Sequence, residues 1–223
     1  MRVYSIGSLL IFMGVWALLF VSFTNPWYHY VENYTFSGDT FRNYQADFYP
    51  THVKVISSNL TTDRNYSYKE IIQTDFWTTK IPLNFTRYVK SSFSFAVLGW
   101  AVATGLIVLT FFDMNETEKK WVGLLGKILG FVVFVFTLLS FSLYVVFKIK
   151  LNDDCKSIYG SSSQFNCDLN GSESNHGFFN GKFFGSTKMA YWGGSSGWRC
   201  VVTACSLSLA GSIYNIFLFH KKK

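Results

Sequence analysis

The sequence predicts a membrane all-α fold, in which a four-helix transmembrane bundle carries a small β-containing extracellular or lumenal region. Of the 223 residues, 49% are hydrophobic and only 15% are charged, against about 25% charged in an ordinary soluble domain. The apolar residues are gathered in four long runs, and the segments between them are rich in Asn, Ser, Thr and Tyr. This segregation argues against a water-soluble enzyme.

The four apolar runs are long enough to cross a bilayer, whose hydrocarbon core of about 30 Å needs about 20 helical residues. We predict spans at residues 6–23, 93–112, 122–147 and 200–219. Lys127 is the one charged residue inside them, and its side chain can extend to the cytoplasmic headgroups. The alternative for the first span is a cleaved signal peptide. We expect retention, because its apolar core is longer than usual and Ser22-Phe23-Thr24 lacks a small-x-small cleavage pattern.

The spans leave two long segments on one side of the membrane. Residues 24–92 and 148–199 form the predicted extracellular or lumenal loops, whereas residues 1–5, 113–121 and 220–223 are cytoplasmic. Lys and Arg are denser in the short segments, as the positive-inside rule requires. We expect the plasma membrane, with an endomembrane as the alternative.

The pattern Asn-x-Ser/Thr, which marks acceptors for N-linked glycosylation, favours the same orientation. It occurs in the long loops at Asn33, Asn59, Asn65, Asn84 and Asn170. Asn115 lies in a cytoplasmic segment, where we expect no glycan, and Asn84 is close to the second span. The sequence therefore predicts a glycoprotein.

Two of the four cysteines, Cys155 and Cys167, lie in the second long loop among Ser, Gly and Asn residues. An oxidising lumen favours a disulfide between them. The alternative is a bond from either one to Cys200 at the outer end of the fourth span. Cys205 lies deeper in that span, where cysteine behaves as a small apolar residue.

Small residues predict where two of the helices meet, because close backbone approach drives helix association in a bilayer. Gly126 and Gly130 are four residues apart in the third span, and Ala204, Ser208 and Ser212 share the same spacing in the fourth. We expect these two faces to pack together.

The sequence nominates no catalytic, cofactor or metal site. The four histidines, His29, His52, His176 and His220, show no metal-ligand spacing, and Cys-x-x-Cys is absent. Residues 193–197 are Gly-rich and indicate a flexible turn. The pI near 9.2 depends partly on the terminal run of three lysines, which favours anionic lipid over nucleic acid. A dilysine retrieval signal is the alternative for that run.

The order of spans and loops resembles the claudin and peripheral-myelin-protein superfamily. The local match is Gly197-Trp198 at the start of the fourth span, followed by Gly211, Tyr214 and the terminal lysines. The family's first outer loop carries a Trp and a pair of Cys, whereas residues 25–91 here contain Trp27 and Trp77 and no Cys. The resemblance implies a small antiparallel sheet in this loop. Residues 53–55, which alternate, and residues 66–79, which are rich in Tyr, Ile, Phe and Thr, suit short strands.

The segment at residues 177–185 predicts a hairpin, because Asn180-Gly181 stands between two pairs of Phe and suits a two-residue type I′ turn. It would place Phe178 opposite Phe183, with Phe179 and Phe184 toward the other face. Arms this short cannot bury four Phe by themselves. Either the first outer loop covers them, or a partner protein or the outer leaflet does.

These observations predict a non-enzymatic multi-pass membrane glycoprotein that makes lateral or cell–cell contacts through its outer loops. The expected partners are the lipid bilayer and a membrane protein or a second copy of the chain, with no nucleic acid and no cofactor. The alternative function is an accessory or pore-forming channel subunit, and a lipid-modifying membrane enzyme is a third hypothesis.

Overall fold

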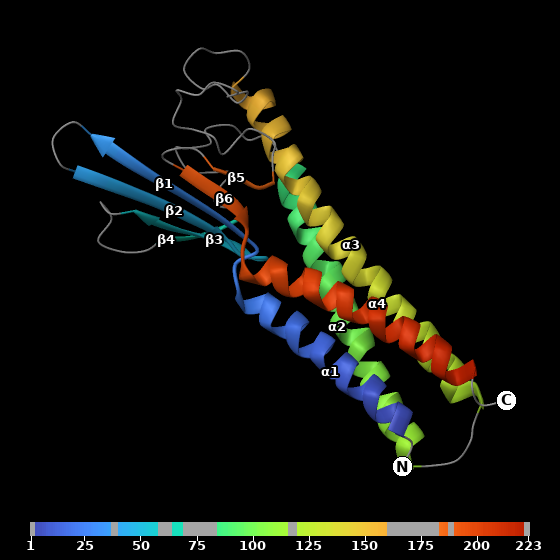
Figure 1. Cartoon of the computed structure of the whole chain (residues 1–223). Helices are drawn as coiled ribbons and strands as arrows, with labels where there is room; N and C mark the ends of the chain where they lie inside the picture. The colour runs from blue at the N-terminus through green and yellow to red at the C-terminus, as the bar shows by residue number, and fades with distance from the viewer. Residues whose placement is uncertain are drawn as a thin grey trace. The chain divides into compact units, whose positions relative to one another are not determined.

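The computed structural model describes residues 3–36, 40–57, 64–68, 84–115, 120–159, 183–186 and 190–220, and within them the chain is mostly helical. The helices are α1 (Val3–Thr24), α2 (Asn84–Asn115), α3 (Lys120–Tyr159) and α4 (Ser196–His220) (Figure 1). The strands are β1 (Tyr28–Phe36), β2 (Thr40–Phe48), β3 (His52–Ser57), β4 (Arg64–Ser67), β5 (Gly185–Ser186) and β6 (Ala190–Gly194). Residues 69–79, the rest of the second predicted strand region, lie outside the described residues.

The four predicted long apolar helices are confirmed. Each is long and apolar enough to cross a membrane, over Ile6–Thr24, Asn84–Phe112, Trp121–Asp154 and Ser196–Phe217. Two helices are longer than the sequence predicts: α2 begins at Asn84 instead of residue 93, and α3 continues past residue 147 to Tyr159. Hydropathy locates only the apolar part of a helix, and these extra turns mix apolar residues with polar and charged ones.

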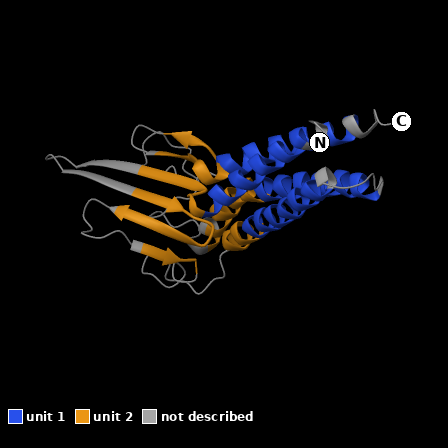
Figure 2. Ribbon diagram, turned by 90° about the horizontal axis from the view of Figure 1, so that it is seen from below, with its two compact units in different colours: residues 1–23, 92–142, 199–223 blue, residues 24–91, 143–198 orange. Residues whose placement is uncertain are grey.

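The described residues form two compact units. Unit 1 comprises residues 1–23, 92–142 and 199–223, and unit 2 comprises residues 24–91 and 143–198 (Figure 2). Each unit is built from segments that are far apart in the sequence.

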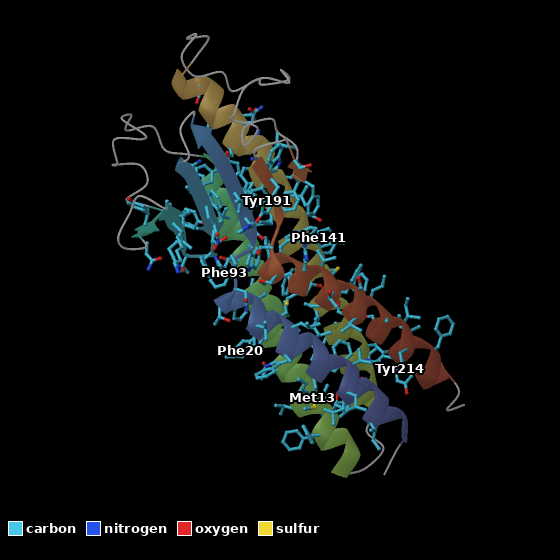
Figure 3. The ribbon with its side chains drawn as sticks, turned by 60° about the vertical axis from the view of Figure 1, so that its left-hand side comes forward. Met13, Phe20, Phe93, Phe141, Tyr191 and Tyr214 are labelled. Atoms are coloured by element: carbon cyan, nitrogen blue, oxygen red, sulfur yellow. The ribbon has the colours of Figure 1, made fainter. Side chains whose placement is uncertain are left out.

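Unit 1 is a helical unit with a narrow buried seam. On α1 the buried side chains Leu9, Phe12, Val15 and Leu19 recur every three or four residues, as one face of a helix requires. Other side chains of α1, including Met13 and Phe20, are about half exposed (Figure 3). Apolar side chains exposed in this way on a membrane-crossing helix suit contact with lipid.

The predicted contact residues of α3 and α4 lie inside unit 1. A Cβ atom placed on Gly130 would lie 3.6 Å from the Ser212 hydroxyl and 3.2 Å from the ring of Phe12. Ala204 and Ser208 are fully buried and Ser212 nearly so. The nearest side-chain neighbour of Gly126 is Leu106 on α2, 3.9 Å from the position that a Cβ on Gly126 would take. Gly126 therefore faces α2, and Gly130 is the α3 glycine at the α4 contact.

Hydroxyl groups join the helices of unit 1. The hydroxyl oxygens of Thr137 and Ser208 are 3.3 Å apart, and Ser92 donates to the carbonyl oxygen of Ser140 at 2.5 Å. Thr137 and Ser208 also donate to carbonyl oxygens of their own helices. Local bonds of this kind satisfy polar groups where no water is available.

Unit 2 contains an antiparallel sheet with the strand order β4-β3-β2-β1-β6-β5. Its longest hairpin, β1 and β2, runs in register from Tyr28 opposite Phe48 to Phe36 opposite Thr40. β6, which follows the third helix in sequence, pairs with β1 so that Tyr30 lies opposite Trp192. The two predicted outer loops therefore contribute strands to one sheet.

One face of the sheet is covered by aromatic side chains of unit 2. Tyr28, Phe48 and Val53 lie opposite one another across β1, β2 and β3 and are buried. The ring of Tyr28 lies 5.2 Å from that of Phe147, and the ring of Trp27 lies 5.0 Å from that of Tyr144. Such edge-to-face pairs add about 0.5–1.5 kcal/mol each beyond their area burial.

The interpretation of residues 193–197 as a flexible turn is wrong. Gly193 and Gly194 end β6, and Gly197 stands in the first turn of α4. A Cβ on Gly193 would lie 2.6 Å from the ring of Phe184, and one on Gly194 would collide with Trp198. These glycines are present because aromatic rings occupy the space of their missing side chains.

Candidate contact surface on the sheet

The open face of the sheet is formed by the residues that alternate with the buried aromatic positions. Since directly opposite residues in an antiparallel sheet share a face, His29, Asp47, Lys54 and Asn65 form one row across β1, β2, β3 and β4. We call this surface, with Gln45 and Tyr191 of the neighbouring row, the open face.

Hydrogen bonds link the centre of the open face. The Nδ1 atom of His29 contacts the Oδ1 atom of Asp47, and the side-chain amide of Gln45 donates to Oδ2 of Asp47 at 2.9 Å. The Nε2 atom of His29 lies 3.4 Å from the Tyr191 hydroxyl. Asp47 is only 8% exposed. A neutral His29 that donates from Nδ1 to this carboxylate keeps Nε2 as an acceptor for the Tyr191 hydroxyl.

The sequence gives no direct sign of this pairing. It predicts a solitary His29, because none of the four histidines shows a spacing such as His-Glu-x-x-His, but the β1–β2 register places Asp47 directly opposite. A prediction of the β1–β2 hairpin and its register would have found the pair. The arrangement can orient an imidazole and present its Nε2 atom, together with the Tyr191 hydroxyl, at the surface. Within the described ranges, no three His, Cys, Asp or Glu side chains form a group that could hold a metal ion.

Two exposed aromatic side chains stand at the β6 end of the open face. Tyr191 is 50% exposed and Phe184 is 54% exposed (Figure 3 labels Tyr191). The ring of Phe184 lies over Gly193, the residue opposite His29. Exposed aromatic groups beside polar ones are characteristic of contact surfaces.

The candidate contact hairpin is only partly described. Phe178 and Phe179 lie outside the described residues, and Phe183 and Phe184 form a bend before the two-residue strand β5. The ring of Phe183 packs 5.3 Å from that of Tyr28 and 5.0 Å from that of Trp198. The chain itself therefore covers Phe183. Of the two described phenylalanines in this segment, Phe184 is the exposed one.

The glycosylation acceptors occupy different settings. Asn65 is exposed on β4, Asn33 lies on β1 opposite Asn43, and Asn84 is the first residue of α2. Asn59 and Asn170 lie outside the described residues. Asn115 is the last residue of α2.

The predicted disulfide also involves residues that are not fully described. Cys155 lies within α3, and Cys167 is outside the described residues. Cys200 and Cys205 are free thiols within α4. The alternative bond to Cys200 is therefore not formed in this structure.

Unit 2 also buries tyrosine hydroxyl groups. Tyr68 is 2% exposed and donates to the carbonyl oxygen of Tyr49 at 2.5 Å. Burial raises the pKa of Tyr68 and that of Tyr28 far above the ordinary value of 10.0, because a phenolate would lose its hydration. Both hydroxyls therefore stay neutral in the folded protein.

No protein-family model matches the sequence, and no curated protein is similar enough to it to count as a match.

Proposed function

We propose that the protein is a non-enzymatic, glycosylated, multi-pass membrane protein of the plasma membrane that makes lateral or cell–cell contacts through the open face. The observation that carries this proposal is the pairing of β6 with β1. It joins both long loops into one sheet, whose open face ends in the exposed rings of Tyr191 and Phe184. Surfaces of this composition are typical of protein contacts, in which aromatic residues are enriched.

A claudin-like relationship is part of the proposal. The strands contributed by residues 28–67 suit the small antiparallel sheet that the family carries in its first outer loop. Gly197 supports the local match as well, because a Cβ there would lie 2.5 Å from the ring of Trp27 and 2.7 Å from the carbonyl oxygen of Asn25. The glycine before Trp198 is thus a requirement of close packing at the start of α4.

The alternative, a channel subunit, takes its support from the buried polar side chains of unit 1, namely Ser92, Thr137, Ser140, Ser208, Ser212 and Asn215. Several of these hydroxyls donate to carbonyl oxygens, as those of Ser212 and Ser208 do. Hydroxyls bonded in this way act as contacts between and within helices. We therefore favour the contact function.

Site-specific photocrosslinking in intact cells tests the proposal. A benzophenone amino acid replaces Tyr191 on the open face, and in the control it replaces Phe217 on α4, which is 70% exposed within a candidate membrane span. We expect protein crosslinks from position 191 at a yield several-fold above that of the control. Equal yields would reject the open face as the contact surface, and conductance of the reconstituted protein would favour the channel alternative.

A further inference from the structure

Two glycosylation sequons have described side chains, and they differ in the burial of the hydroxyl residue and in the contacts of the asparagine. Asn65-Tyr66-Ser67 lies in β4, an end strand of the sheet, with Asn65 and Ser67 exposed. Asn84-Phe85-Thr86 forms the first turn of α2, where Asn84 is exposed but Phe85 is 1% and Thr86 is 8% exposed. The hydroxyl residue of the sequon is therefore exposed in β4 and buried in the first turn of α2.

The side chain of Asn84 is engaged with a buried carboxylate. Its amide nitrogen donates to Oδ1 of Asp154 at 3.0 Å, and the backbone N–H of Phe85 donates to Oδ2 of Asp154 at 2.9 Å. Asp154 lies on α3 and is 2% exposed. The first N–H groups of a helix lack partners inside the helix, and a carboxylate is a favourable acceptor there. Asp154, on α3, thus caps the first turn of α2 through the N–H of Phe85, and its other oxygen accepts a hydrogen bond from the Asn84 side chain.

In the sequon of Asn65, both the asparagine and its hydroxyl residue Ser67 are exposed. Asn65 lies directly opposite Lys54, so its side chain belongs to the open face at the β4 end of the row. Among the strands the structure describes, β4 pairs with β3 only. An end strand presents unpaired N–H and C=O groups that can pair with another chain, and proteins usually block such an edge.

We propose that Asn65 carries an N-linked glycan and that Asn84 does not, and that this glycan blocks the β4 edge of the sheet. The proposal rests on the proposed orientation, with the sheet outside the cytoplasm. The glycan then stands at the opposite end of the open face from Tyr191 and Phe184. Contacts are directed to the β1–β6 end, and pairing of β4 with a second chain is prevented.

The modification is a transfer from a lipid-pyrophosphate-linked oligosaccharide. The side-chain nitrogen of Asn65 forms a bond to the anomeric carbon of the first sugar. The bond between that carbon and the pyrophosphate oxygen breaks, and the lipid pyrophosphate leaves with the electron pair. The amide gives up one proton to a base, so no oxidant or reductant is needed.

Gel mobility of the full-length protein expressed in cells tests the assignment. We expect Asn65→Gln and Ser67→Ala each to remove one glycan step, and Ser67→Thr, which keeps the sequon, to retain it. Asn84→Gln and Thr86→Val each destroy the other sequon and should leave mobility unchanged. Loss of a step in Thr86→Val, or none in Asn65→Gln, would overturn the proposal.

Glycosidase treatment of the unaltered protein separates this inference from the proposed orientation. If the enzyme shifts the mobility of the unaltered protein but Asn65→Gln runs like it, the orientation stands and the Asn65 assignment fails. If the enzyme shifts nothing, the orientation fails too.

The structural role of Asn84 has its own readout. Asp154→Asn removes the charge that receives two bonds, so we expect the unfolding temperature in detergent to fall by several degrees with unchanged mobility. Asp153→Asn is the matched control, because Asp153 is half exposed and its carboxylate forms a surface ion pair with Lys150 at 2.9 Å. Equal effects from the two variants would reject the capping role.

The edge-blocking role is tested by crosslinking between copies. A short amine-reactive crosslinker should join two chains of the Asn65→Gln variant at least threefold more efficiently than two chains of the unaltered protein. Equal efficiency with and without the sequon would show that the glycan does not shield β4.

Discussion

The two units keep their polar groups satisfied in different ways. In unit 1, hydroxyls such as those of Thr137 and Ser212 bond to carbonyl oxygens four residues earlier in the same helix. In unit 2, the Tyr68 hydroxyl and the Asp154 carboxylate bond to groups that are 19 and 69 residues away in sequence. Unit 1 therefore combines local bonds, which a helix supplies by itself, with a few bonds between helices such as that from Ser92 to Ser140. The bonds of Tyr68 and Asp154 in unit 2 depend entirely on the tertiary fold.

Glycine also has a different use in each unit. In unit 1, Gly130 lets helices approach closely, since a Cβ there would meet side-chain atoms of α1 and α4 at 3.2–3.6 Å. In unit 2, glycines such as Gly193 provide a flat surface for an aromatic ring. Lipid gives helices no hydrophobic reason to associate, so close backbone approach is what membrane-spanning helices need, whereas the burial of aromatic rings stabilises a sheet.

The largest effect is expected at Gly197 in unit 2. Gly197→Ala would place a Cβ 2.7 and 2.9 Å from the carbonyl oxygens of Asn25 and Pro26, which are backbone atoms that cannot rotate away. Overpacking costs about 1–3 kcal/mol, and more where the backbone must shift. We expect a loss of about 3 kcal/mol or failure to fold, measured by unfolding temperature and by size-exclusion chromatography in detergent.

Gly105→Ala is the control for that experiment. Apart from Gly105 itself, its two chain neighbours and the backbone of its own helix, no atom of the described residues lies within 4 Å of the position that a Cβ on Gly105 would take. Ala favours a helix interior over Gly by about 1 kcal/mol. This variant should be neutral or slightly stabilised. If the two alanines behave alike, the close packing around Gly197 is not what the fold requires.

The second effect tests the packing of unit 1. Ser208 is fully buried beside Thr137, whereas Leu209, one residue further along, is 42% exposed. Ser208→Leu forces the α3 and α4 backbones apart, so we expect a loss of about 2 kcal/mol. Leu209→Phe should change stability by less than about 0.5 kcal/mol. Thermal unfolding in detergent compares them, and similar losses would mean that this face of α4 does not contact α3.

The sequence predicts unit 1 better than unit 2 because a membrane helix is a local pattern. Uninterrupted apolar runs locate the helices, and small-residue spacing indicates Gly130 and Ser208 as contact positions. The same spacing places Gly126 toward α4, whereas the structure turns it toward α2. Helical periodicity defines a face only to within part of a turn, so the choice of neighbour depends on the arrangement of all four helices.

Unit 2 depends on pairings that no local pattern displays. Residues 53–55 alternate clearly and indicate β3, but β1 and β2 contain polar and aromatic residues without strict alternation. The opposition of His29 and Asp47 follows only from the register of that hairpin, and the capping of α2 by Asp154 follows only from tertiary packing. The helical turns beyond residue 147 are polar, so their composition predicts a loop where the structure has a helix.

The smallest effect concerns the buried hydroxyl of Tyr68 in unit 2. Tyr68→Phe removes its bond to Tyr49, so near pH 8 we expect a loss of about 1 kcal/mol in the free energy of unfolding.

Burial raises the pKa of Tyr68 above the ordinary value of 10.0, so above pH 10 the unfolded chain releases a proton that the folded chain keeps. The unfolded state then binds fewer protons, and the stability of the unaltered protein falls by up to about 1.4 kcal/mol per pH unit from this group. The variant lacks this contribution, so its deficit should shrink and then reverse as the pH rises. Denaturation in detergent between about pH 8 and pH 11 measures the difference, and a deficit that stays constant over this range would show that the Tyr68 hydroxyl ionises as readily in the fold as in the unfolded chain.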